Sequence, residues 1–76
     1  MILPRLKKLL IKNNIVPKNI TVNDNFLKLG LIDSFTFMNL ISIIEKNFQV
    51  TFSKKELSFN NFNSLKKIEK VINEKK

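Results

Sequence analysis

An acid and a hydroxyl stand side by side at Asp33 and Ser34, between the apolar runs of "LKLGLIDSFTFMNL". A serine hydroxyl becomes a nucleophile when a neighbouring base accepts its proton, and the chain contains no His. No Lys lies within the turns next to Ser34 either. We therefore predict that the protein has no catalytic residue of its own.

Two other roles for this pair remain open. Either residue could cap a helix that follows, because Asp and Ser are both favoured at the N-cap. Alternatively, Ser34 could accept a group that another enzyme attaches. A phosphate ester suits such a position, since a helix N-terminus offers unpaired N–H groups and the positive end of the helix dipole to an anion.

The length and composition narrow the classes of protein further. A chain of 76 residues buries only about 60% of its unfolded surface, which predicts a single domain over residues 1–76. Such a small core leaves little scaffold for an enclosed active-site pocket. The absence of Cys and His excludes disulfides, thiolate nucleophiles and the usual zinc sites, so no metal site is expected. The lack of Cys is also compatible with a cytoplasmic location.

The net charge of +8 suggests an anionic partner such as nucleic acid, but the distribution of charge favours another explanation. Lys is over-used together with Asn, Ile and Phe, as expected from coding biased toward A and T, and the lysines are spread along the whole chain. We therefore expect a solvated basic surface and no nucleic-acid partner. No apolar run approaches the roughly 20 residues that span a bilayer, so no membrane span is expected.

The spacing of apolar residues predicts an all-α fold. Ile2, Leu3, Leu6, Leu9 and Leu10 recur at helical spacing and predict a first helix that ends near residues 13–14. A second helix is predicted over residues 34–48, one helical turn over residues 53–57, and a last helix capped by Asn63 or Ser64. The stretch "FQVTF" has no second strand to pair with and is predicted to be an extended connector. The sum is a small four-helix bundle with three main helices and one short one.

A long ordered loop is predicted between the first two helices, over residues 15–32. It contains Pro17, the single Gly30 and a cluster of Asn and Asp. Its apolar members are expected to hold it against the core: Ile20, Val22, Phe26, Leu29 and Leu31.

The second helix has one apolar face and several apolar residues outside it. At 100° per residue, a single arc collects the predicted core residues Phe37, Leu40, Ile41, Ile44 and Phe48. The remaining arc is polar except for Phe35, Met38 and Ile43. The loop could cover at least one of these three. Phe35 and Met38, in the turn next to Ser34, are the better candidates for a surface that contacts a partner.

The chain resembles the acyl carrier proteins of the phosphopantetheine-binding family. The resemblance rests on "FLKLGLIDSFTFMNLISIIEKNF", where Phe26, Leu29, Gly30, Asp33 and Ser34 match the family's signature. It extends to "VTF" before the short helix and to "FNSLKKI" at the start of the last one, and with the first helix it covers nearly the whole chain.

The resemblance implies that Ser34 receives a 4′-phosphopantetheine arm from coenzyme A, and that Asp33 helps a separate phosphopantetheinyl transferase to recognise the site. The arm's thiol would hold an acyl or aminoacyl group as a thioester, which fits a chain without Cys. The protein would be a non-catalytic, monomeric carrier in the cytoplasm, and acyl or aminoacyl ligases and synthases would be its partners. The face implied to meet them comprises Phe35, Met38, Asn39, Ile43, Glu45 and Lys46.

One departure from the family concerns charge. Carriers of fatty-acid synthesis present carboxylates on the second helix, whereas this helix has Asn39, Lys46 and Asn47 beside Glu45. We therefore expect a carrier of a specialised pathway, with acidic partners as one possibility. The alternatives are a D-alanyl carrier protein, the housekeeping carrier of fatty-acid synthesis and, more distantly, a small basic module that binds nucleic acid. The core could admit an acyl chain, or be filled by its phenylalanines: Phe37, Phe48, Phe52, Phe59 and Phe62.

Overall fold

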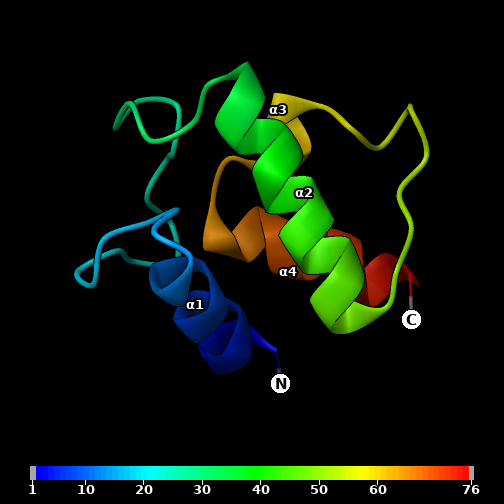
Figure 1. Cartoon of the computed structure of the whole chain (residues 1–76), viewed down its shortest axis with the longest axis horizontal. Coiled ribbons are helices and arrows are strands. Elements are labelled where there is room, and N and C mark those ends of the chain that lie inside the picture. Colours follow the sequence, from blue (N-terminus) through cyan, green and yellow to red (C-terminus); the bar gives the residue numbers. More distant parts are fainter. Residues whose placement is uncertain (1, 76) are drawn as a thin grey trace.

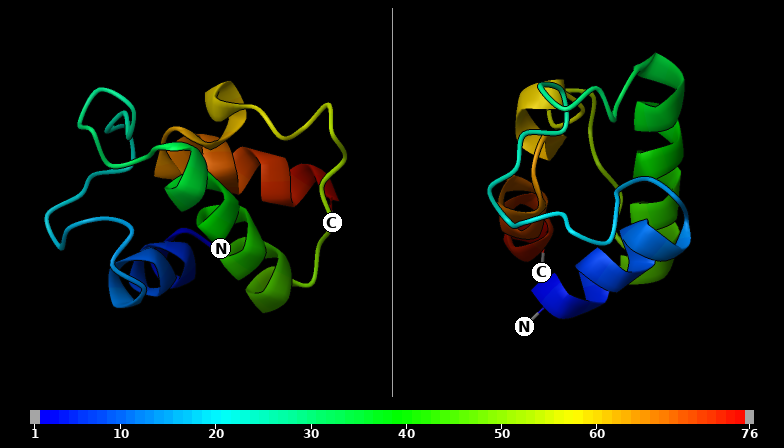
Figure 2. Two further views of the ribbon diagram at one scale, coloured as in Figure 1. Left: turned by 45° about the horizontal axis from the view of Figure 1, so that its top comes forward. Right: turned by 90° about the vertical axis from the view of Figure 1, so that its left-hand side faces the viewer.

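The protein is a bundle of helices, with the second helix on one side and the last two helices on the other (Figure 2). The structure, a computed structural model, describes residues 2–75. In this range it contains α1 (Leu3–Lys12), α2 (Ser34–Phe48), α3 (Phe59–Phe62) and α4 (Leu65–Lys75), and no strand. α4 crosses behind α2 (Figure 1), and the turned views in Figure 2 show the interior between them. The predicted all-α class, with three main helices and one short one, is confirmed.

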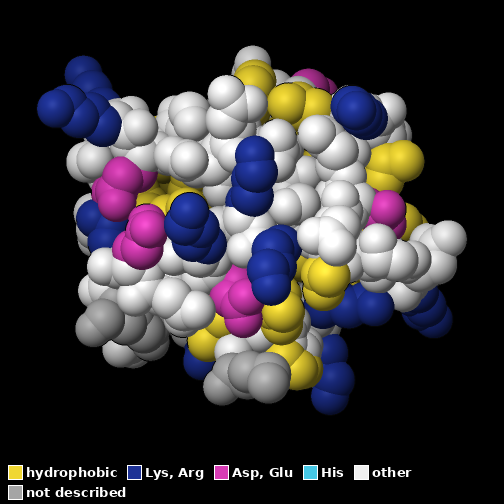
Figure 3. Space-filling model, turned by 180° about the vertical axis from the view of Figure 1, so that it is seen from behind, with side chains coloured by type: hydrophobic (Ala, Val, Ile, Leu, Met, Phe, Trp, Pro, Cys, Tyr) yellow, Lys and Arg dark blue, Asp and Glu magenta, His cyan; other side chains and the backbone are white. Residues whose placement is uncertain are grey.

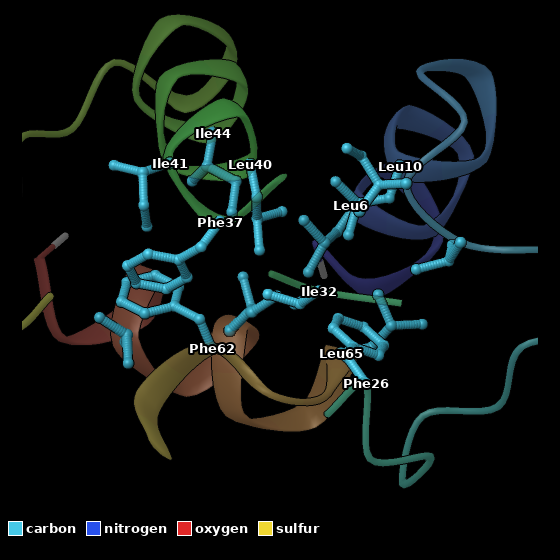
Figure 4. Packing of buried hydrophobic residues seen from close by; sticks show 14 of the residues in the cluster. Leu6, Leu10, Phe26, Ile32, Phe37, Leu40, Ile41, Ile44, Phe62 and Leu65 are labelled. Atoms are coloured by element: carbon cyan, nitrogen blue, oxygen red, sulfur yellow. The ribbon is translucent and has the colours of Figure 1, made fainter. Parts of the chain in front are cut away.

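The apolar faces of the helices meet in one core. All five residues predicted for the α2 face are buried, and α4 buries four residues at helical spacing: Leu65, Ile68, Val71 and Ile72. α1 adds Leu6 and Leu10, which lie opposite the α2 side chains (Figure 4). None of the helices in the described part of the chain has the length and apolar character needed to cross a membrane.

Phenylalanine rings pack between α2 and the segment from residue 52 to residue 62. The ring of Phe37 meets Phe59 and Phe62 edge-on, with centroids 4.7 and 5.7 Å apart. Phe52 and Phe62 make a third edge contact at 5.1 Å. Aromatic pairs prefer this arrangement, so the rings fix how α3 lies against α2.

The loop between α1 and α2 is held at its centre by the start of α4. The backbone N–H of Phe26 donates to the carbonyl of Asn63 at 2.7 Å, and that of Lys66 donates to the carbonyl of Val22 at 3.0 Å. Ile20 and Phe26 are buried as predicted. The prediction for Val22 and Leu29 was wrong, because these side chains are 37% and 54% exposed. The loop follows the core through its backbone contacts and a few large side chains, so the rest of its apolar residues can face solvent.

The short helix lies further along the chain than predicted. Residues 53–57 form a hydrogen-bonded turn, in which Leu57 N–H donates to the Ser53 carbonyl at 3.2 Å. Glu56 closes this turn by accepting from the Ser53 N–H and by pairing with Lys75 on α4. The helix forms instead at α3, where the Phe59 and Phe62 rings pack onto Phe37. Local capping residues predicted the turn, whereas aromatic packing determines where the helix forms.

Candidate functional site

Ser34 is the first residue of α2, and its neighbour Asp33 is the cap. Asp33 has extended backbone angles (φ −119°, ψ −174°), and its Oδ1 accepts from the Thr36 N–H at 2.8 Å. The choice between Asp33 and Ser34 as N-cap is therefore resolved in favour of Asp33. Ser34 is exposed, and the hydrogen bonds within residues 2–75 include none from its hydroxyl. The hydroxyl is thus available to an outside reagent.

The carboxyl of Asp33 is negatively charged beside this hydroxyl. The Thr36 backbone N–H, which donates to it, lowers the pKa of Asp33 below its ordinary value. A carboxylate at this point is favoured by the positive end of the α2 dipole. Asp33 therefore presents a fixed anionic group one residue before Ser34, on the surface of the protein.

An open groove begins at Ser34 and runs between α2 and the segment before α3. Its volume is about 370 Å³, and its walls are Ser34, Phe37 and Met38 on one side and Leu57, Ser58 and Phe59 on the other. In Figure 1, α3 lies behind the start of α2 at the top of the molecule. The walls are mostly apolar, so the groove can receive an apolar chain attached next to it.

The residues across the groove were not predicted as part of the site. Leu57 and Ser58 carried no signal for the site in the sequence, and Phe59, named among the rings that could fill the core, is 38% exposed. They reach Ser34 only because the Phe37 and Phe59 rings pack together. An apolar residue flanking a short helix is a weak signal that could have suggested them.

The predicted partner surface divides into two parts along α2. Phe35 is 79% exposed and Met38 56%, and Asn39 is also exposed in the same part of the helix as Ser34. Phe35 is the most exposed of the large apolar side chains in the part of the chain that the structure describes. These residues form an apolar and polar surface around the Ser34 hydroxyl.

The second part of the predicted partner surface lies toward the C-terminal end of α2, and there the environment of Glu45 differs from the expected exposed position. Glu45 is half-buried, and its Oε2 accepts from the Phe52 N–H at 3.0 Å, which fastens the connector after α2. Ile43 is half-buried against the core, whereas Lys46 is exposed. The carboxylate of Glu45 therefore has a structural contact that its place on the helix did not predict.

The accessible hydroxyl at a helix N-terminus, with a separate residue as the cap, fits a covalent phosphate ester. In the comparison with protein families, a family model described as a phosphopantetheine attachment site matches residues 5–72. A search of curated proteins and a search of solved structures each found no match. Because the family model covers most of the chain, the protein belongs to the phosphopantetheine-binding family of carrier proteins, whose members bear a covalently attached 4′-phosphopantetheine group.

Proposed function

We propose that Ser34 is the attachment point of the 4′-phosphopantetheine arm and that the protein carries acyl or aminoacyl groups as thioesters. The observation that supports this most directly is the exposed Ser34 hydroxyl, which makes no hydrogen bond within residues 2–75 while Asp33 caps α2. When bound, the arm supplies a thiol, a group that this Cys-free chain lacks. The protein would deliver its cargo without a catalytic role of its own.

Each residue near Ser34 has a role in this proposal. The carboxylate of Asp33 gives the phosphopantetheinyl transferase a fixed charge to recognise. The first turn of α2 offers its N–H groups and positive dipole end to the phosphate. Phe35, Met38 and Asn39 present the surface that partner enzymes contact around the arm, and the groove beside Ser34 accommodates apolar parts of the arm or cargo.

The charge of the protein favours a specialised pathway over the housekeeping carrier of fatty-acid synthesis. Four of its six carboxylates accept hydrogen bonds from nearby backbone N–H groups, and the other two lie on α4: Asp24, Asp33, Glu45 and Glu56, then Glu69 and Glu74. The solvent face of α2 therefore has little negative charge to attract a basic enzyme. Acyl or aminoacyl ligases and synthases with other surfaces are the proposed partners, and a D-alanyl carrier remains the alternative.

Nucleic-acid binding is less well supported. On the face opposite the one seen in Figure 1, Lys and Arg side chains are dispersed and lie among Asp and Glu (Figure 3). A phosphate backbone is bound by a concentrated basic stripe or patch. We also propose that the carrier is cytoplasmic, where coenzyme A can donate the arm, and that it is a monomer.

Intact-mass spectrometry tests the attachment. After co-expression with a broad-specificity phosphopantetheinyl transferase, we expect the mass to rise by one phosphopantetheinyl group in the wild type and to stay unchanged in Ser34→Ala. Ser58→Ala is the matched control, because Ser58 is an exposed serine on the same groove, and it should be modified like the wild type. Modification of Ser34→Ala, or an unmodified wild type, would refute the proposal.

A further inference from the structure

The last turns of α1 and α2 share a five-residue pattern. Residues 9–13 read "LLIKN" and residues 43–47 read "IIEKN", so each has two apolar residues followed, after one position, by Lys and Asn. The first apolar residue, the Lys and the Asn stand at positions i, i+3 and i+4, which lie on the same side of a helix. Each helix therefore presents the same three kinds of side chain along one side.

The two copies meet across a groove of about 340 Å³. Its lining includes Leu9, Lys12 and Asn13 from α1 and Ile43, Lys46 and Asn47 from α2. α1 runs at an angle to α2 (Figure 2), and the guanidinium of Arg5, near the start of α1, donates to the Asn47 carbonyl near the end of α2. Lys12 and Lys46 therefore enter the lining from different helices, and the apolar side chains of Leu9 and Ile43 line the same groove.

The groove contains no acidic side chain to balance its lysines. Lys12 and Lys46 are exposed, and within residues 2–75 the only ion pair joins Lys75 and Glu56, on another part of the surface. Glu45 precedes Lys46, but its carboxylate binds the Phe52 N–H. By contrast, the exposed face of α4 has Glu69 and Glu74 among its lysines. Each groove lysine also suits the last turn of its helix, but the dipole does not explain why both line one apolar groove.

The amide groups in the groove are fixed by the helices themselves. Asn13 Nδ2 donates to the Leu9 carbonyl and Asn47 Nδ2 donates to the Ile43 carbonyl, both at 2.8 Å. The Leu9 and Ile43 side chains are half-buried against the core, and so form a firm apolar floor. A ligand that fits this groove therefore needs an apolar stripe with negative charges beside it to pair with Lys12 and Lys46. An amphipathic helix with Leu on one side and flanking carboxylates has this chemistry, whereas a nucleic-acid backbone would leave the floor without a partner.

We propose that this groove between α1 and α2 docks an acidic amphipathic helix of an acyl or aminoacyl ligase or synthase that serves the carrier. The inference rests on the proposed carrier function for the existence of such an enzyme, and it adds the chemistry of the enzyme's surface. The groove holds the enzyme on α1 and α2, while Ser34, at the opposite end of α2, remains open to its active site.

Peptide titration followed by amide NMR tests the docking on the whole protein. The probe is a short synthetic helical peptide of Leu and Glu, and the comparison peptide has Lys in place of every Glu. We expect the Glu peptide alone to shift the amides of residues 9–13 and 42–47. Lys12→Gln/Lys46→Gln should weaken its binding by roughly tenfold, as expected for two exposed charge pairs, and Lys12→Glu/Lys46→Glu should bind the Lys peptide instead.

A control of equal net charge separates the groove from general attraction. Lys54→Gln/Lys55→Gln removes the same charge from an exposed turn that contributes nothing to the groove, and it should bind the Glu peptide like the wild type. Equal weakening in the two double variants would overturn the proposal, as would displacement of the peptide from these amides by a single-stranded oligonucleotide.

The two proposals fail independently. Ser34→Ala cannot be loaded but should still bind the Glu peptide, and Lys12→Gln/Lys46→Gln should still be loaded by the transferase. A loaded wild type that does not bind the peptide would refute the docking inference alone. An unloaded wild type would refute the attachment proposal, whatever the peptide does.

Discussion

Phe62 should be among the most sensitive positions of the core, and Phe35 among the least sensitive apolar ones. Phe62 is completely buried, and its ring makes edge contacts with Phe37 and Phe52. Truncation of a buried Phe to Ala costs about 3–5 kcal/mol, and each edge contact adds about 0.5–1.5 kcal/mol beyond burial. We therefore expect Phe62→Ala to lower the free energy of unfolding by about 4–8 kcal/mol. A domain of this length has roughly 4–11 kcal/mol in total, so little stability would remain.

Urea unfolding followed by far-UV circular dichroism measures this loss, because the chain is helical and lacks Trp and Tyr as fluorescent probes. Phe35→Ala is the matched control: it removes the same atoms from a side chain that is 79% exposed, and should change stability by less than about 0.5 kcal/mol. Phe62→Leu should lose about 1–2 kcal/mol, since it keeps most of the buried volume, and it remains measurable if Phe62→Ala does not fold. Similar losses in Phe62→Leu and Phe35→Ala would refute the assignment of Phe62 to the centre of the core.

Three further predictions concern the surroundings of Ser34 and the ends of α2. The Thr36 N–H lowers the pKa of the Asp33 carboxyl, so the stabilising contribution of Asp33 is present above about pH 4 and is lost as pH falls through the lower folded pKa. Asp33→Asn still caps the helix, so the variant should lose less stability than the wild type as the pH is lowered. The same loss of stability at acid pH in both proteins would contradict this. Glu45→Ala should lower the free energy of unfolding by about 1 kcal/mol, because the Phe52 N–H loses its acceptor, and Glu45→Gln should lower it less. Urea midpoints equal to that of the wild type in both variants would show that this hydrogen bond is unimportant for stability. Gly30 has φ +71°, and an added Cβ would meet open space. Gly30→Ala should therefore lower the free energy of unfolding by about 1–2 kcal/mol through backbone strain alone, and Gly30→Asn should lower it less. A Gly30→Ala variant as stable as the wild type in urea would contradict this.

The regular parts of the fold could be predicted from the sequence because their information is local. The 3.6-residue period of Phe37, Leu40, Ile41 and Ile44 identifies the buried face of α2, and the period in α4 does the same. The sequence narrowed the N-cap of α2 to two adjacent residues, Asp33 and Ser34. The geometry resolves it, since only the Asp33 carboxylate reaches the Thr36 N–H.

The contacts that could not be predicted join segments without a shared period. The bond between Glu45 and the Phe52 N–H crosses the connector after α2, so a helical wheel places Glu45 on the solvent side. The groove beside Ser34 similarly depends on how Phe59 packs on Phe37. The exposure of Val22 and Leu29 has the same origin, because a loop has no period from which burial can be derived.

The bonds between the long loop and the start of α4 also affect the order of events during synthesis. Val22 and Phe26, which precede Ser34, are held by Lys66 and Asn63, about 40 residues later in the chain. Such distant contacts form only after the intervening segment has been made and its loop has closed. The approach to Ser34 therefore cannot take its folded form while a ribosome is still synthesising α2 or α3. If the proposed attachment at Ser34 requires the folded site, the transferase acts only after Lys66 has emerged.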